Sequence, residues 1–405
     1  MKRKQITAAA MAFLMAAAIQ APAYAYGEGP AGKGTEQDGI AYGGPNGTTE
    51  EEAAAAASLE DNKMEYGELG ALIENYNADY KNASSKVINN VVDLEGARML
   101  KEEASELKDE ASDLDLSDQS ESTREIYKSY KETAKELRKA AQKITNTDVK
   151  DKYLRSLKKA KSQLTMVAQQ MMIGYEQAVA SQPLINKQVE LAEASLSSVQ
   201  LQAASGMKSQ EDILTAEQNL KTAENAAAQF NAKLQSTKQT LQMLTGWSHD
   251  AQPEICEIPA PDLSRIAAMN PANDLQAATG ASYALYDIRS VAAAGSSARN
   301  VKKRNVSQME QDLASTLQSL YASVIAGRQT YEGAQAELQA AVQDKQAADR
   351  KNSMGMMGRQ EYLKAEADYL TAVSDEKTAE LNLFLAMEKY DWTLKGLDVS
   401  GTGGN

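Results

Sequence analysis

Apolar and small residues recur along most of the chain at alternating steps of three and four residues, the spacing of coiled-coil helices. The clearest run begins after Gly206 and occupies Ile213, Ala216, Leu220, Ala223, Ala227, Phe230, Leu234, Thr237, Leu241 and Leu244. This unbroken repeat predicts a narrow, left-handed seam, and the alanines in it allow helices to approach closely. An amphipathic helix on a globule would instead need a wider and bulkier apolar stripe.

The same seam recurs after Gly355, at Tyr362, Ala365, Tyr369, Ala372, Glu376, Ala379, Leu383, Ala386 and Tyr390. The residues that lead into the two seams also match, because 206–217 reads GMKSQEDILTAE and 355–366 reads GMMGRQEYLKAE. Both copies end in Leu-x-Gly, at 244–246 and 394–396, where a glycine can close a helix. We therefore predict an internal duplication, in which each copy is a long helix, a glycine turn and a return helix.

Shorter helices precede the first long one. Apolar spacing predicts a helix from Leu69 to Tyr76 that Asn77 ends, and a second helix over about 80–114. A polar break at 115–122 places Ser122 three residues before Glu125, which suggests a capping box. The next helix is expected to run to about 204, with a kink at 146–148.

The second copy follows a proline-containing linker, since helix interiors reject the prolines of 247–263. It restarts near Asn270-Pro271, is broken at 295–297 and continues as a long helix over about 298–352. The expected organisation is a signal peptide (1–25), a flexible Gly-rich and acidic leader (26–60), a first helical repeat (61–246), the linker (247–263), a second repeat (264–397) and a disordered tail (398–405).

The first residues have the pattern of an export signal. Lys2, Arg3 and Lys4 precede an apolar stretch, and Ala23 and Ala25 form the small-x-small site of signal peptidase. A retained anchor is the alternative, but the stretch falls short of the ~20 apolar residues of a spanning helix. We expect an exported protein of the cell envelope.

Charge and residue content argue against several function classes. The chain has 43 Lys+Arg against 56 Asp+Glu, and this formal charge of −13 disfavours nucleic acid as a partner. Because it contains one Cys (Cys256) and one His (His249), a catalytic triad, a Cys–His pair or a thiolate/imidazole zinc site is difficult to assemble. We expect no enzyme activity, no metal and no cofactor. His249 is expected in an exposed turn, and Cys256 is expected to be a packed or idle thiol.

The twin tips carry a family resemblance. A glycine-hydrophobic turn, then an acid and Leu-x-Ala-Glu, occurs at 206–217 and again at 355–366, and the whole of about 60–397 resembles the TolC-type outer-membrane efflux proteins. Two further features agree with it: a short helix runs into Asn77-Ala78 and Asn270-Pro271, although Ala78 replaces a proline, and a proline-rich linker follows Leu-x-Gly.

The resemblance implies a homotrimer in which long hairpins close an α-barrel tunnel. It assigns docking of a periplasmic adaptor, coupled to an inner-membrane pump, to the hairpin tips Gly206, Met207, Lys208, Ser209, Gly355, Met356, Met357 and Gly358. It also places Asp212 and Glu361 at an aperture, where six carboxylates would resist full ionisation. The plainer interpretation of the glycines is that tight turns need them. The plainer interpretation of Asp212 and Glu361 is that they are ordinary acids in the first turn of a helix.

One departure from the family changes the expected form. The breaks at 115–122 and 295–297 are too short for membrane-spanning strands, so the expected fold is all-α, with duplicated antiparallel coiled-coil hairpins and no or minimal β-barrel. Such a conduit would lie in the outer membrane of an organism that has one, and otherwise be associated with the wall. The alternative is a secreted coiled-coil protein that structures the wall or regulates its hydrolases.

Overall fold

The computed structural model describes residues 59, 61–113, 121–144, 148–248 and 250–399. The predicted signal peptide, nearly all of the predicted leader, His249 and most of the predicted tail lie outside these described residues. Within them the chain is all-α apart from two strands of two residues each, which confirms the predicted fold class.

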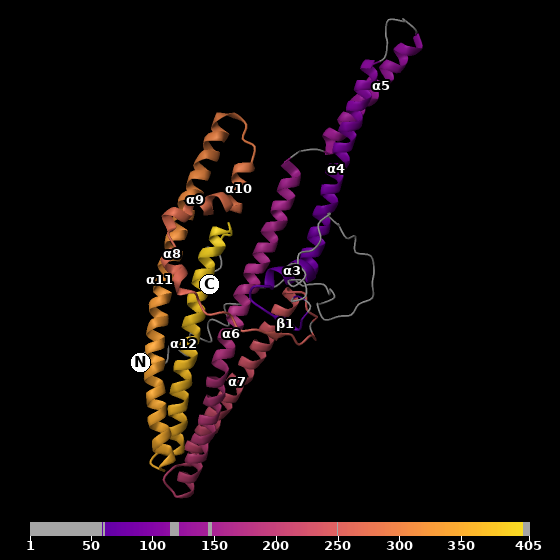
Figure 1. The fold of residues 1–405 in the computed structure, drawn as a ribbon. Coiled ribbons are helices and arrows are strands. Elements are labelled where there is room, and N and C mark those ends of the chain that lie inside the picture. The colour runs from indigo at the N-terminus through magenta and orange to yellow at the C-terminus, as the bar shows by residue number, and fades with distance from the viewer. Residues whose placement is uncertain (1–58, 60, 114–120, 145–147, 249, 400–405) are drawn as a thin grey trace.

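Two long hairpins form the body of the molecule. The first pairs α6 (Asp148–Ala204) with α7 (Gln210–Leu244), and the second pairs α11 (Gly295–Ser353) with α12 (Arg359–Leu394). Every residue of the two predicted seams is buried or half-buried, so both seams are confirmed. Because α6 also packs along α12, the four helices lie side by side in the order α7, α6, α12, α11, and both tips point the same way (Figure 1).

The four body helices end in the same manner. Gly206, Gly246, Gly355 and Gly396 have φ between +66° and +89°, which a side chain with a Cβ adopts only with strain. After each glycine, the next N–H donates to a carbonyl five residues back, as Met207 does to Gln202 at 2.8 Å. This Schellman ending confirms that glycine closes both Leu-x-Gly segments.

A small apolar core lies at the end of the first hairpin that is far from its tip. It is built from α3 (Leu69–Tyr76), the adjacent parts of α6, α7 and α12, and the paired strands β1 (Lys63–Met64) and β2 (Glu254–Ile255). Leu69, Leu72 and Ile73 are buried there, as the predicted face of that helix requires, and Asn77 ends the helix. The linker thus returns beside the start of the first repeat.

The first repeat carries an additional helical arm. It consists of α4 (Ala78–Asp113) and α5 (Glu121–Ile144), which pack against each other and project beyond the body (Figure 1). The predicted capping box is wrong, because α5 already begins at Glu121 and Ser122 lies inside the helix. The expected kinked helix corresponds to α5 and α6, and residues 145–147 of its predicted kink lie outside the described residues.

The second repeat has shorter helices in the corresponding place: α8 (Leu263–Ala268), α9 (Pro271–Ala281) and α10 (Tyr283–Ser290). The break before the long helix lies at 291–294 rather than 295–297, because Gly295 is already the first residue of α11. Its φ of +85° allows the chain to turn sharply at that point.

The structure also changes which residues correspond between the repeats. Gly246 lies against Tyr76, at the end of α3, and Gly396 lies against Ala281, at the end of α9. Asn77 therefore corresponds to Ser282 rather than to Asn270, since each of the two accepts a hydrogen bond from an N–H three residues later, at the start of α4 or α10. Asn270 caps α9 instead.

Candidate functional site

The two hairpin tips are the most exposed apolar points of the body. Met207 is 70% exposed and Met356 is 72% exposed, each directly after its positive-φ glycine. No atom lies within 4 Å of a Cβ built on Gly206 or Gly355, so these glycines serve the turn and not a close contact. The structure thus places the predicted tip residues together at one end of the molecule (Figure 1).

The first tip is held by a capping box. The Ser209 hydroxyl accepts from the Asp212 N–H, and the Asp212 carboxylate accepts from the Ser209 N–H at 2.8 Å. Lys208 donates to the same carboxylate at 3.2 Å. The Ser209 N–H and hydroxyl, followed by Lys208, hold the pKa of Asp212 below its usual value. Asp212 therefore has a local structural role.

The second tip lacks this box. Gly358 occupies the N-cap position of α12 without a side-chain acceptor, and Glu361 is exposed in the first turn. Among the described residues no hydrogen bond or ion pair joins Glu361 to Asp212. The predicted aperture of these acids therefore stays a prediction.

Three exposed apolar residues lie near the tips; sequence reasoning placed Leu214 in the tip motif without a docking role and missed the other two. Leu201 is 72% exposed, Leu214 is 57% exposed and Met354 is 64% exposed. They lie outside the seam positions and within two turns of a tip glycine. Large apolar residues that are close to a predicted turn but do not belong to a seam would have indicated this exposed apolar surface.

A polar interface joins the two hairpins. The antiparallel contact of α6 with α12 contains Gln177 bonded to Asn382 at 2.9 Å and Ser181 bonded to Ser374 at 2.9 Å. The same contact pairs Glu176 with Lys377 at 3.2 Å. Since these pairs repeat along the helices, they fix the register of one hairpin against the other.

Near the tips, Glu366 of α12 connects three helices. Its carboxylate lies 3.2 Å from the Lys187 ammonium of α6 and 3.5 Å from the Lys345 ammonium of α11. Lys345 also contacts Asp349 and the Tyr362 hydroxyl. This ionic cluster holds the two tips beside each other within the chain.

The two outer helices leave an uncovered face. A shift of 149 residues carries α6 onto α11 and α7 onto α12. It also carries Ser181 onto Thr330, and Asn225 onto Ser374. Ser181 and Ser374 are buried against each other, whereas Thr330 and Asn225 are exposed. The edges of the helical layer thus repeat a contact that is made in its middle.

Little in the structure favours nucleophilic or metal chemistry. Burial, before any charge effect, raises the pKa of the half-buried Cys256 thiol, which disfavours the reactive thiolate. Among the described residues no three His, Cys, Asp or Glu side chains are placed to hold a metal ion. In the same part of the chain, no helix combines the length and apolar content of a membrane span.

Comparison with known proteins gave matches among solved structures alone. No protein-family model matches the chain, and no curated protein does. The outer membrane protein VceC of Vibrio cholerae is 13% identical over 60% of this chain and 72% of its own, with a TM-score of 0.42. The CmeC outer membrane channel of Campylobacter jejuni is 12% identical over 93% and 94%, with a TM-score of 0.45. The outer-membrane channel OprN is 12% identical over 82% and 90%, with a TM-score of 0.44. With TM-scores below 0.5, these matches leave the function to be inferred from this chain's own residues.

Proposed function

We propose that this protein is a non-enzymatic conduit of an efflux or export system in the cell envelope. Copies assemble edge to edge into a closed helical tunnel, a trimer as the family resemblance implies, and the hairpin tips dock an adaptor that couples the tunnel to an inner-membrane pump. The observation that carries the proposal is the pair of uncovered outer helices, α7 and α11. Each corresponds to a helix of the other repeat, α12 or α6, that is covered inside the chain.

The duplicated contact specifies how copies would join. Inside the chain, α12 of the second hairpin packs on α6 of the first. The same contact between α7 of one copy and α11 of the next joins unlike surfaces, and a repeated contact of unlike surfaces closes into a ring when the rotation allows it. In that arrangement Asn225 of one copy faces Thr330 of its neighbour, as Ser374 faces Ser181 within the chain.

The tips suit an interface with another protein. Each tip presents a methionine after its glycine, and Leu201, Leu214 and Met354 extend the apolar surface around them. Clusters of exposed apolar residues of this kind mark interaction sites. Flexible methionine side chains adapt to a partner's shape.

Cysteine pairs test the ring directly. In mature protein carrying Cys256→Ser, the pair Asn225→Cys and Thr330→Cys is oxidised and run on a non-reducing gel. We expect a ladder that ends at three chains. The pair Ser181→Cys and Ser374→Cys is the matched control, because its hydroxyl oxygens lie 2.9 Å apart and its disulfide closes within one chain without adding mass.

A second control fixes the register. The pair Asn225→Cys and Thr316→Cys keeps both residues on the same helices but shifts one by 14 positions, about 21 Å along α11. It should not cross-link. If the Asn225/Thr330 and Asn225/Thr316 pairs gave equal ladders, the cross-links would come from random collision and the proposed ring would be wrong. A chain that stays monomeric would instead support a secreted coiled-coil structural or regulatory protein.

Adaptor docking needs a separate test, because docking at the tips could be wrong even if the ring is correct. A photoreactive residue at Met356 should capture a membrane-anchored protein with its own helical hairpin, and the same residue at Met99, which is 67% exposed on the arm, should not. Capture of the same protein at both positions would overturn docking at the tips.

A further inference from the structure

The first turns of α11 carry an unusual run of positive charge. Arg299, Lys302, Lys303 and Arg304 lie within the first ten residues of the helix, and Glu310 is its first acidic residue. The chain as a whole has a net charge of −13, so this cluster is a local exception to its acidic surface.

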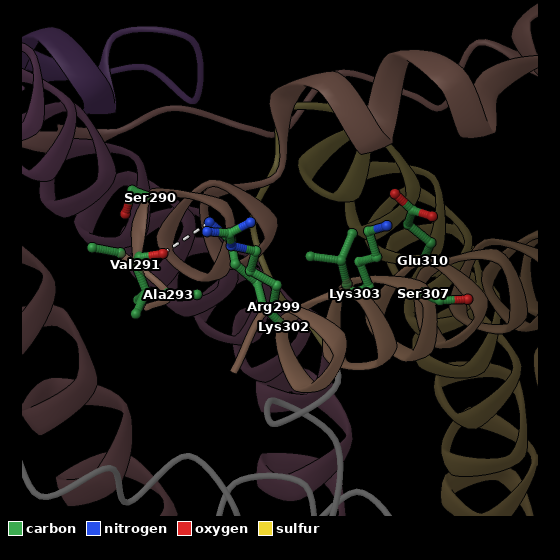
Figure 2. Close-up of a pocket in the computed structure, with 10 residues that line it drawn as sticks. Ser290, Val291, Ala293, Arg299, Lys302, Lys303, Ser307 and Glu310 are labelled. Carbon is green, nitrogen blue, oxygen red and sulfur yellow. Dashed lines mark hydrogen bonds between the residues drawn. The ribbon is translucent and has the colours of Figure 1, made fainter. Parts of the chain in front are cut away.

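Three of these cations, Arg299, Lys302 and Lys303, line an open pocket of about 570 Å³ together with Glu310, between the end of α10 and the first turns of α11 (Figure 2). Ser290 and residues 291–293 form one wall, and Arg299, Lys303 and Ser307 form part of the other. No aromatic side chain is among the described residues that line the pocket.

Two of the nearby cations already have partners. Lys302 donates to the Val291 carbonyl at 2.8 Å (Figure 2). It also donates to the Arg289 carbonyl, so it satisfies the C-terminal end of α10. Arg289 pairs with Glu310 at 2.7 Å. Both interactions stabilise the fold of the turn without any ligand.

The other three cations are not neutralised in this way. Within the described part of the chain, Arg299, Lys303 and Arg304 make no ion pair, and Arg299 and Lys303 line the pocket. Arg299 and Lys303 are four residues apart, so they lie on one helix face with their Cβ atoms about 6 Å from each other. Arg304 follows on the adjacent face.

We propose that this pocket, with Arg299, Lys303 and Arg304, binds a linear polymer that carries phosphate groups along its backbone. Guanidinium groups bind phosphate through paired hydrogen bonds, and the one-turn spacing lets successive cations contact successive anionic groups. The pocket offers no aromatic platform on which nucleic acid bases could stack, which disfavours single-stranded nucleic acid.

The arm argues for a flexible polymer over a flat membrane. The helices α4 and α10 start from corresponding caps, but α4 has 36 residues and α10 has 8. At 1.5 Å per residue, α4 extends about 40 Å farther than α10. Figure 1 shows the arm ending well beyond the α10–α11 turn. A bilayer would meet the arm first, whereas a polymer chain can reach the pocket beside it.

Binding of a fluorescent linear polyphosphate to the mature chain, followed by anisotropy, tests this site. If each of the three cations contacts one phosphate, as on a single-stranded nucleic acid, the logarithm of affinity should fall with the logarithm of salt concentration with a slope of about −2. The affinity should then fall about 20-fold between 50 and 200 mM salt. The variant R299Q/K303Q/R304Q should lose at least tenfold in affinity and most of that slope. Lys302 is left intact because it supports the fold.

The matched control is K135Q/R138Q/K139Q, which removes the same charge from exposed positions on the arm. It should bind polyphosphate nearly as well as the wild type. Equal losses in both variants would reduce the effect to general charge and overturn the site. Orthophosphate that competes at the same phosphate concentration would overturn the polymer. Tighter binding of polyaspartate, of a single-stranded oligonucleotide or of vesicles with anionic lipid would overturn the assigned chemistry.

Discussion

The junction between α3 and α7 depends on a glycine that has no room for a side chain. Gly246 has φ +88°, and a Cβ placed on it would lie 2.4 Å from the Tyr76 Cβ and 2.5 Å from the Tyr76 carbonyl carbon. Gly246→Ala therefore combines two costs. The left-handed conformation costs about 1–2 kcal/mol with a Cβ, and overpacking against backbone costs about 1–3 kcal/mol.

Gly206→Ala separates these two costs. Gly206 has φ +77°, but a Cβ there would meet nothing within 4 Å. The Gly206→Ala variant should lose about 1–2 kcal/mol of unfolding free energy by strain alone, whereas Gly246→Ala should lose about 2–5 kcal/mol in total. Gly396→Ala should match Gly246→Ala, since its Cβ would lie 2.2 Å from the Ala281 carbonyl oxygen.

Amide hydrogen exchange measures the effect where it arises. Gly246→Ala should reduce the protection of the α3 amides and of the first α4 amides by tenfold or more, while the amides of the second hairpin keep theirs. Gly206→Ala should change only amides at its own tip. The reasoning would be refuted if the two alanine variants had equal effects, because the close approach to Tyr76 would then carry no free energy.

Three further predictions concern polar groups. Asn77→Ala removes the buried amide bond to the Leu244 carbonyl and the cap of α4, and should lower the free energy of unfolding by about 1–3 kcal/mol in urea titrations; an unchanged midpoint would contradict this. Since the pKa of Asp212 is lowered in the folded chain, its stabilising effect is complete above the unfolded pKa and is lost as pH falls through the folded pKa. The protection factor of the Ser209 amide, which compares its exchange with the intrinsic rate at the same pH, should therefore fall at low pH in the wild type, and in Asp212→Ala it should be low at neutral pH too. Glu366→Gln weakens the contacts between hairpins, so spin labels on the two tips should report a broader distance distribution, and an unaltered distribution would show that the polar pairs farther along suffice.

The seams could be predicted from the sequence because a 3.5-residue repeat reports directly which positions are covered. The same repeat does not say what covers the rest of a helix. α12 packs on α6 as well as on α11, and Leu381, Phe384 and Trp392, buried between seam positions, are the sequence trace of that second contact. The corresponding positions of α7 are Ala232, Gln235 and Met243, which are smaller, polar or exposed. A comparison of the two copies therefore favours α12 as the central helix.

The errors came from motifs whose residues have more than one use. Ser122 and Glu125 have the spacing of a capping box, but Ser and Glu are also ordinary polar residues on an exposed helix, and α5 begins one residue earlier. Likewise, Asn270-Pro271 resembles Asn77-Ala78 in letters, yet only contacts between distant residues, Gly246 with Tyr76 and Gly396 with Ala281, show that Ser282 takes the equivalent place. Such contacts leave no local trace in the sequence.

The unequal lengths of α4 and α10 set the number of places that each end of an assembly could offer. Each repeat has one glycine tip, so a ring of n copies would present 2n tips. At the opposite end only one repeat per copy bears the long arm, and the count falls to n. A component at the first end can therefore be present at twice the stoichiometry of one held by the arms.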